Sequence, residues 1–521
     1  MKIGRCSGIL LHITSLPGKY GIGDLGPAAL AFVDRLVASG QKIWQILPLG
    51  PTGYGDSPYA AFSSFAGNEL LIDVETLWKD GLLTRSDLSS LLDISHAPVD
   101  YGRLVNRKLP LLRKAAATFQ RKRGNKAAYR EFLARERHWL DDYALFRSIK
   151  AVHEAAAQAQ GGGVSIWNLA WPVALQQRRP EALEDWRASH ADEVESYRIQ
   201  QFFFFRQWEA LKAYANRHGV AIVGDLPIFA ALDSADVWAA PEFFQLDKHL
   251  QPLAVAGVPP DYFSADGQLW GNPLYDWPAH RRQAFAWWTS RLRQALRWYD
   301  MVRIDHFRGF EAYWAVPAGA RTARHGRWEK APGRELFTAL QRELGVDLPI
   351  IAEDLGVITD EVRSLRDDFG LPGMRILQFA FGCGPDGRSL DASNSFLPHN
   401  YVENCVAYTG THDNDTLVGR YVSPEGDLPA DQDAARRELA LVHDYLGWQP
   451  KNLCAALVRE ILRSVARVAI LPAQDILESG RETRMNTPST LGRNWSWRLR
   501  PRDLKSKAWD RLQVLCRLYS R

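Results

Sequence analysis

The chain has 521 residues, enough for one large domain with insertions or for two to three smaller domains. Its 64 lysines and arginines nearly balance 60 aspartates and glutamates. This net charge of +4 argues against nucleic acid or an anionic membrane as the main partner and favours a neutral ligand. The five cysteines are scattered and odd in number, which argues against disulfides or structural zinc and predicts reduced thiols in the cytoplasm.

The N-terminal segment is the first feature along the chain. It has a basic start, but its apolar run before Pro17 is too short for the core of a signal peptide. No later stretch approaches the roughly 18 uncharged apolar residues that a membrane-spanning helix needs. We therefore expect a cytoplasmic protein without a membrane span.

Short β-rich segments that end in polar residues recur along the chain, and several precede a helical pattern. This order is typical of parallel strands joined by crossover helices. Eight such segments are present, the number that closes a (β/α)8 TIM barrel, so we expect residues 1–521 to form one catalytic barrel domain. The segments are Gly8–Ile13, Lys42–Leu49, Ala221–Asp225, Met301–Asp305, Pro349–Glu353, Met374–Ala380, Cys405–Thr411 and Val468–Pro472.

A long interval separates the second and third predicted strands. It spans about 170 residues, far more than one crossover helix needs. Apolar side chains within it recur at helical spacing. We therefore expect an inserted, largely helical subdomain at approximately residues 70–215.

A second insertion is expected at approximately residues 240–280. Within it, Val258–Trp277 carries two early prolines and then glycines on both sides of Gln268 and Trp270, a composition typical of a projecting loop. Two interpretations remain open from composition alone. The segment is either a lid over the active site or a rigid connection that packs its aromatic rings inward.

Charged side chains close several of the predicted strands. Asp225, Asp305 and Glu353 end the third, fourth and fifth segments, and His412 and Asp413 follow the seventh. In a (β/α)8 barrel, the catalytic residues lie at these C-terminal strand ends. A single aspartate there is more often a helix N-cap, but four acidic residues together favour a catalytic site.

Carboxyl groups that converge on one small volume repel each other, which raises the pKa of at least one of them. A proton donor and an ionised partner then coexist near neutral pH, as cleavage of a glycosidic bond requires. Arg303 lies two residues before Asp305, so both side chains point to the same side of the strand. Its guanidinium can hold the carboxylate ionised and oriented.

Metal and nucleotide motifs are missing from the sequence. His12, His306, His399 and His412 do not have a recognised metal-binding spacing. The sequence also contains neither a phosphate-binding GxxxxGK[ST] loop nor a GxGxxG motif after a strand. We predict that the protein uses no catalytic metal and no cofactor.

Four motifs, GDLPIF, VRIDHFRG, IIAEDLG and TGTHDND, stand in the order of the four sequence regions shared by the α-amylase clan. Their forms resemble the 4-α-glucanotransferases of glycoside hydrolase family 77, also called amylomaltases or disproportionating enzymes. Further matches cover nearly the whole chain. They are SLPGKYGIGDLG at Ser15–Gly26, LGPTGYGDSPYAAFSSFAGN at Leu49–Asn68, VPPDYFSADGQLWGNPLYDW at Val258–Trp277, LPHNY at Leu397–Tyr401 and NWSWRL at Asn494–Leu499.

The resemblance implies roles for individual residues. Asp305 would be the nucleophile, Glu353 the general acid/base, and Asp413 the carboxylate that binds the donor sugar and stabilises the transition state. The implied substrate-binding residues are Arg303 beside Asp305, Asp225 and His412 in the first donor subsite, Tyr59 stacked on that sugar, Gln268 and Trp270 on the lid, and Tyr54 on a second glucan-contacting surface.

The implied reaction transfers a segment of an α-1,4-glucan to the 4-hydroxyl of another glucan or glucose, without an obligate protein partner. Two alternatives remain. An α-glucan hydrolase would use the same residues, because residue types do not show how an acceptor sugar competes with water. A non-catalytic glucan-binding protein is disfavoured by the intact Asp305, Glu353 and Asp413.

Overall fold

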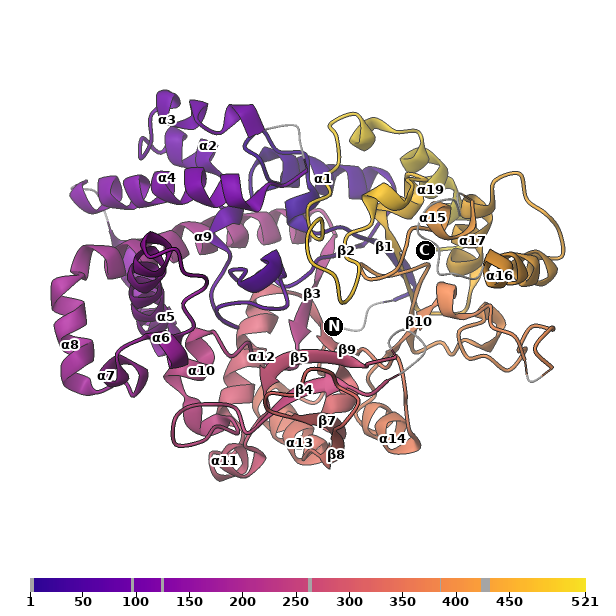
Figure 1. Cartoon of the computed structure of the whole chain (residues 1–521). Helices are drawn as coiled ribbons and strands as arrows, with labels where there is room; N and C mark the ends of the chain where they lie inside the picture. Colours follow the sequence, from indigo (N-terminus) through magenta and orange to yellow (C-terminus); the bar gives the residue numbers. More distant parts are fainter. Residues whose placement is uncertain (1–3, 95–97, 123–125, 261–264, 385, 423–431) are drawn as a thin grey trace.

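The computed structural model describes residues 4–94, 98–122, 126–260, 265–384, 386–422 and 432–521 (Figure 1). Within these ranges, eight parallel strands close into a barrel in the order β1-β12-β11-β10-β9-β6-β3-β2. Their bounds are β1 (Cys6–Leu10), β2 (Ile43–Gln45), β3 (Ala221–Pro227), β6 (Met301–Asp305), β9 (Ile350–Ala352), β10 (Gly373–Ile376), β11 (Cys405–Tyr408) and β12 (Val468–Pro472).

The prediction of a (β/α)8 barrel is confirmed, and each predicted segment contains or overlaps one barrel strand. The bounds of β6 and β12 agree with the prediction. The strands β2, β9, β10 and β11 are shorter than predicted, because the sequence pattern continues past the point where ladder pairing ends. The predicted strand Met374–Ala380, for example, stops at Ile376, and Leu377–Phe379 forms a 3-10 turn. Strand β3 extends two residues further than predicted, to Pro227, and β1 begins two residues earlier, at Cys6.

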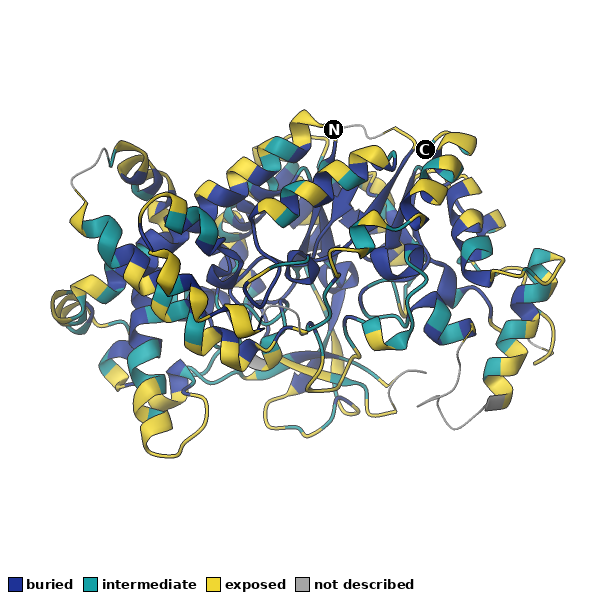
Figure 2. Ribbon diagram, turned by 90° about the horizontal axis from the view of Figure 1, so that it is seen from above, coloured by how far each residue is buried: buried dark blue, intermediate teal, exposed yellow. Residues whose placement is uncertain are grey.

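Helices surround the barrel and cover the outer faces of its strands. Strand residues such as Ile9, Val302 and Ile470 are fully buried, as expected between a filled barrel interior and a helical layer. Figure 2 shows this division, with buried strands at the centre and exposed residues on the outer faces of the helices. The helices outside the first long insertion are α1 (Pro27–Ala38), α10 (Ala235–Ala239), α11 (Trp277–Arg282), α12 (Ala286–Trp298), α13 (Gly333–Leu344), α14 (Asp360–Asp368), α15 (Leu417–Tyr421), α16 (Gln432–Leu446), α17 (Leu453–Arg463), α18 (Ala473–Ile476) and α19 (Ala508–Leu518).

The interval between β2 and β3 is occupied by helices that project to one side of the barrel (Figure 1). The two longest are α5 (Ala127–Ala159) and α9 (Ala191–Arg217). They pack through aromatic rings, for example Phe132 on Phe202 at 5.6 Å and Trp139 on Phe205 at 5.8 Å between ring centroids. The helices are α2 (Val74–Lys79), α3 (Arg85–Ser89), α4 (Tyr101–Arg121), α5 (Ala127–Ala159), α6 (Trp167–Ala170), α7 (Val173–Gln176), α8 (Pro180–Ser189) and α9 (Ala191–Arg217).

Segments after β3 and β6 build a second, antiparallel sheet of four strands among the described residues, in the order β5-β4-β7-β8. Its strands are β4 (Ala254–Val258), β5 (Gln268–Pro273), β7 (Ala312–Pro317) and β8 (Arg327–Lys330). The segment expected as a projecting loop is therefore partly a strand pair. No helix in the described ranges combines the length and apolar character needed to cross a bilayer.

Candidate active site

Asp225 and Arg303 occupy paired positions on the neighbouring strands β3 and β6. The preceding Gly224 allows close packing, since a Cβ there would lie 2.1 Å from the ring of Tyr299. The Arg303 Nη1 donates to both carboxylate oxygens of Asp225, at 2.8 and 2.7 Å. Its Nη2 lies 2.8 Å from Asp305 Oδ1, so one buried guanidinium serves both carboxylates.

Asp305 is the last residue of β6, and its side chain lies on the same side as that of Arg303, as expected. Burial raises the pKa of Asp305 above its ordinary value, and the guanidinium of Arg303 opposes this rise. The Asp305 side chain keeps 31% of its surface exposed, whereas Asp225 keeps none. Asp305 is therefore the partner of Arg303 that a ligand can reach.

Glu353 follows β9 directly and is held by two backbone donors. The His306 N–H donates to its Oε2 at 2.6 Å, and the Leu355 N–H donates to its Oε1 at 2.9 Å. His306 adopts the left-handed region (φ 54°, ψ 47°), which is uncommon for a residue with a Cβ and is typical of constrained functional sites.

The pKa of Glu353 is raised to about 8, first by burial and then by the negative charge of Asp305. Arg303 and the two backbone N–H groups only partly offset this rise. The site thus combines a carboxyl group that stays protonated near neutral pH with a carboxylate, Asp305, that is paired with a guanidinium. These are the two states that acid-assisted displacement at a sugar carbon requires.

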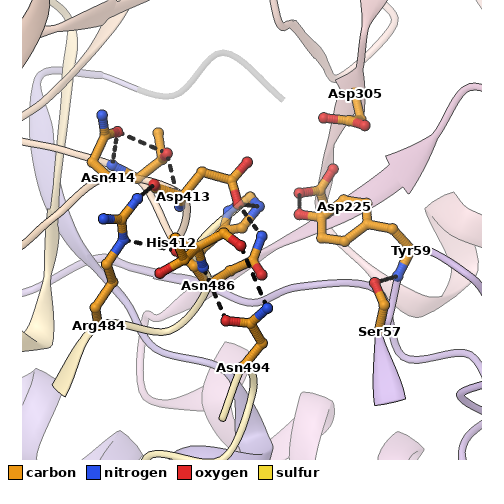
Figure 3. Close-up of polar contacts among 12 residues, drawn as sticks. Ser57, Tyr59, Asp225, Asp305, His412, Asp413, Asn414, Arg484, Asn486 and Asn494 are labelled. Atoms are coloured by element: carbon orange, nitrogen blue, oxygen red, sulfur yellow. Dashed lines mark hydrogen bonds and ion pairs between the residues drawn. The ribbon is translucent and has the colours of Figure 1, made fainter. Parts of the chain in front are cut away.

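Asp413 lies in the loop after β11, on another side of the site (Figure 3). Its Oδ1 accepts a hydrogen bond from Asn486 Nδ2 at 2.7 Å and lies 3.4 Å from His412 Nε2. Nearly half of its side chain, 46%, remains exposed. In Figure 3 the carboxylate points toward the region of Asp225 and Asp305, so a ligand between Asp413 and the exposed Asp305 would contact both.

Tyr59 lies between Asp225 and His412 and contacts both. Its hydroxyl donates to Asp225 Oδ2 at 2.8 Å, and its ring stacks on His412 with centroids 5.2 Å apart and planes at 17°. Trp495 packs beside both rings at 5.9 Å. The ring of Tyr59 was expected to stack on a sugar; in the structure one stacking partner is His412. The side chain of Tyr54 lies outside the described residues.

Gln268 and Trp270 lie on β5, and Trp270 lies close to His306, the residue after Asp305. The Trp270 indole N–H donates to Gln268 Oε1 at 3.2 Å, and its ring meets the His306 ring edge-on at 4.8 Å. Trp270 is 37% exposed, so it does not pack inward as the rigid-connection alternative required. Its exposed ring, beside the His306 that follows Asp305, can contact a ligand.

Three residues of this site were not predicted from the sequence. Trp495 belongs to the NWSWRL motif, which matched the family pattern but had no assigned role. Its ring lies against Tyr59 and His412. Arg484 and Asn486 lie in an irregular segment beyond β12 and carry no motif. Within the described residues, no group of three or more His, Cys, Asp or Glu side chains is arranged to hold a metal ion.

A (β/α)8 barrel with acidic residues gathered at its C-terminal strand ends is typical of enzymes that cleave or transfer glycosidic bonds. The sequence model of glycoside hydrolase family 77, described as 4-alpha-glucanotransferase, matches residues 11–505. The chain belongs to this family, and its activity is that of a 4-alpha-glucanotransferase.

Individual relatives agree over the full length. The 4-alpha-glucanotransferases of Thermus thermophilus and of Synechocystis are each 47% identical to the chain, with 99% of this chain and 99% and 98% of those proteins covered. Among solved structures, the amylomaltase from Streptococcus agalactiae in complex with acarbose is 40% identical, with a TM-score of 0.90 and 99% of each chain covered.

Proposed function

We propose that the chain transfers a segment of an α-1,4-glucan to the 4-hydroxyl of another glucan or of glucose by a retaining double displacement. The observation that carries this proposal is the unequal pair at the site: Glu353 with a pKa of about 8 beside Asp305, whose carboxylate is held by Arg303. The mechanism requires an acid and a nucleophile close together, and Glu353 directly follows β9 while Asp305 ends the neighbouring strand β6.

In the first step, a carboxylate oxygen of Asp305 attacks the anomeric carbon of the donor. The bond from that carbon to the glycosidic oxygen breaks, and Glu353 gives its proton to this oxygen as the first product leaves. In the second step, the Glu353 carboxylate takes the proton of the acceptor 4-hydroxyl. The acceptor oxygen then attacks the anomeric carbon and displaces Asp305, so the configuration at that carbon is retained.

Other residues would hold the donor sugar during these steps. Asp413 and His412, on the loop after β11, would bind hydroxyls of the reacting sugar, with Asp225 and Tyr59 beside them. The exposed part of Asp413 leaves carboxylate surface free for such a contact. Gln268 and Trp270 on β5 would contact the glucan from the sheet above His306.

Maltotriose as the sole substrate tests the transfer reaction. The energy of the broken bond is kept in the Asp305 ester until an acceptor arrives, so the expected products include both glucose and glucans longer than three units. Size separation of the products over time is the measurement. If maltose and glucose accumulate with no longer product at any maltotriose concentration, the protein is an α-glucan hydrolase.

The pH dependence tests the role of Glu353. Because only the protonated acid can assist the leaving group, kcat/KM for maltotriose should fall as the pH rises through about 8, the pKa of Glu353. An activated donor such as α-glucosyl fluoride needs little protonation, so its pH profile should lose most of this alkaline decline. A decline that is the same for both donors would assign the titration to another group.

A further inference from the structure

The segment Arg484–Asn486 contacts the loop that carries Asp413 at several points. Arg484 Nη2 donates to the backbone carbonyl of Asp413 at 2.6 Å, and Arg484 Nε donates to the carbonyl of Asn486 at 2.8 Å. One guanidinium therefore joins the two segments (Figure 3). It binds backbone carbonyls, whereas the neighbouring Arg481 binds the carboxylate of Asp415 at 2.6 Å.

Asn486 completes the contact. Its backbone N–H donates to the carbonyl of His412 at 3.1 Å, and its side-chain Nδ2 donates to Asp413 Oδ1 at 2.7 Å. The carbonyls of both His412 and Asp413, and one carboxylate oxygen of Asp413, are thus bound by a single segment. This arrangement fixes the backbone of Asp413 and orients its carboxylate.

Such support is needed because Asp413 does not lie on a strand. Strand β11 ends at Tyr408, so ladder hydrogen bonds do not hold Asp413 in place as they hold Asp305 on β6. The local bond from the Asp413 N–H to Thr411 Oγ1 is long, at 3.3 Å. A catalytic group that is misplaced by about 1 Å can cost about 100-fold in rate.

We propose that Arg484 is a positioning residue for glucan transfer: it fixes Asp413 through the backbone, while Asn486 sets the orientation of the carboxylate. This inference rests on the proposed function of Asp413 in stabilising the transition state. Because that stabilisation is strongest in the transition state, loss of Arg484 should lower kcat more than it raises KM.

A small pocket lined in part by Arg484 makes a direct test possible. It is also lined by His12, His412 and Asp475. Truncation of the Arg484 side chain would open a hole continuous with this pocket. A free guanidinium ion could enter that hole and donate to the two carbonyls, whereas urea has the same shape but no charge.

The experiment compares Arg484→Ala with the wild type, using maltotriose. We expect kcat to fall about 100-fold while KM changes only a few-fold. Guanidinium chloride, at concentrations well below those that unfold the protein, should restore a substantial part of kcat, and urea should not. The control is Arg511→Ala, which removes an exposed arginine paired with Glu478 and should change neither kcat nor the response to guanidinium.

Unchanged kcat in a folded Arg484→Ala protein would overturn the proposal, as would a loss confined to KM or a loss that guanidinium does not restore. If the alanine variant fails to fold, Arg484→Lys carries the test. Lysine keeps the charge but cannot span both carbonyls, so kcat should fall about tenfold. An unchanged kcat in this variant would also contradict the proposal.

Asp413→Ala is measured in parallel and separates this inference from the proposed function. If Asp413→Ala is inactive and Arg484→Ala is fully active, Asp413 is catalytic but does not depend on Arg484. If Asp413→Ala remains active, the role proposed for Asp413 is itself wrong.

Discussion

Replacing Asp305 by asparagine should remove nearly all glucan transfer, with a fall in kcat on the order of 10⁴-fold or more. The amide is close in shape to the carboxylate but cannot attack the anomeric carbon. Arg303 keeps its two hydrogen bonds to Asp225, so the buried guanidinium retains a charged partner and the fold should persist. Steady-state rates with maltotriose and the melting temperature are the two measurements.

Asp225→Asn is the matched control, because it also takes a negative charge from Arg303. Asp225 does not attack the sugar in the proposed mechanism, so this variant should retain much more activity than Asp305→Asn. Equal losses in the two variants would contradict the assignment of Asp305 as the nucleophile.

Replacing Glu353 by glutamine should lower kcat for maltotriose by about 10²–10⁴-fold, the range typical of general acid–base catalysis. The loss should be much smaller for the glycosylation step with α-glucosyl fluoride, whose leaving group needs little protonation. A loss of equal size for that step with both donors would contradict the role of Glu353 as proton donor. Single-turnover rates with the two donors are the measurement.

The Glu353→Gln substitution should also lower the folding stability of the protein, which is measured together with its activity. The carboxyl group accepts N–H groups from His306 and Leu355, one on each oxygen. Glutamine has a single acceptor oxygen, so one of these backbone donors loses its partner. Such a loss costs about 1–3 kcal/mol of folding free energy, and the melting temperature of the variant should fall accordingly.

Much of the barrel could be predicted because the apolar segments that form its strands are closed by the acidic residues of the site. Strand β6 is largely apolar and ends in Asp305, and Glu353 directly follows the apolar strand β9, so the same segments indicate both the parallel ladder and the barrel edge where the acidic residues lie. The pairing of Arg303 with Asp305 follows from strand alternation alone. Its second partner, Asp225, depends on the register between two strands that are distant in the sequence.

The contacts between loops could not be predicted. Asn486 bonds to Asp413 across 73 residues, and both lie in irregular segments without a hydrophobic period. The stacking of Tyr59 on His412 likewise depends on the closed barrel, because β2 and β11 belong to opposite parts of the chain. Local composition contains no information about such pairs.

The antiparallel sheet beside the site likewise could not be predicted from local sequence. Its strand β4 pairs with β7, which comes after the barrel strand β6, so the sheet combines two separate loops. The prolines and glycines near Gln268 and Trp270 predicted a projecting segment, and β5 does pair with the nearby β4. The other partner of β4 is β7, which lies too far along the chain to leave a local pattern. The exposure of Trp270 therefore became clear only from the structure.

In the proposed mechanism, Asp305 forms a covalent bond to the donor sugar. Glu353→Gln should accumulate this intermediate from α-glucosyl fluoride, because the variant lacks the base that activates the acceptor. Peptide mapping of the quenched protein by mass spectrometry is the measurement. We predict one added glucosyl unit on the peptide that contains Asp305. A glucosyl unit on any other residue, or consumption of the fluoride without an adduct at any time point, would contradict the mechanism.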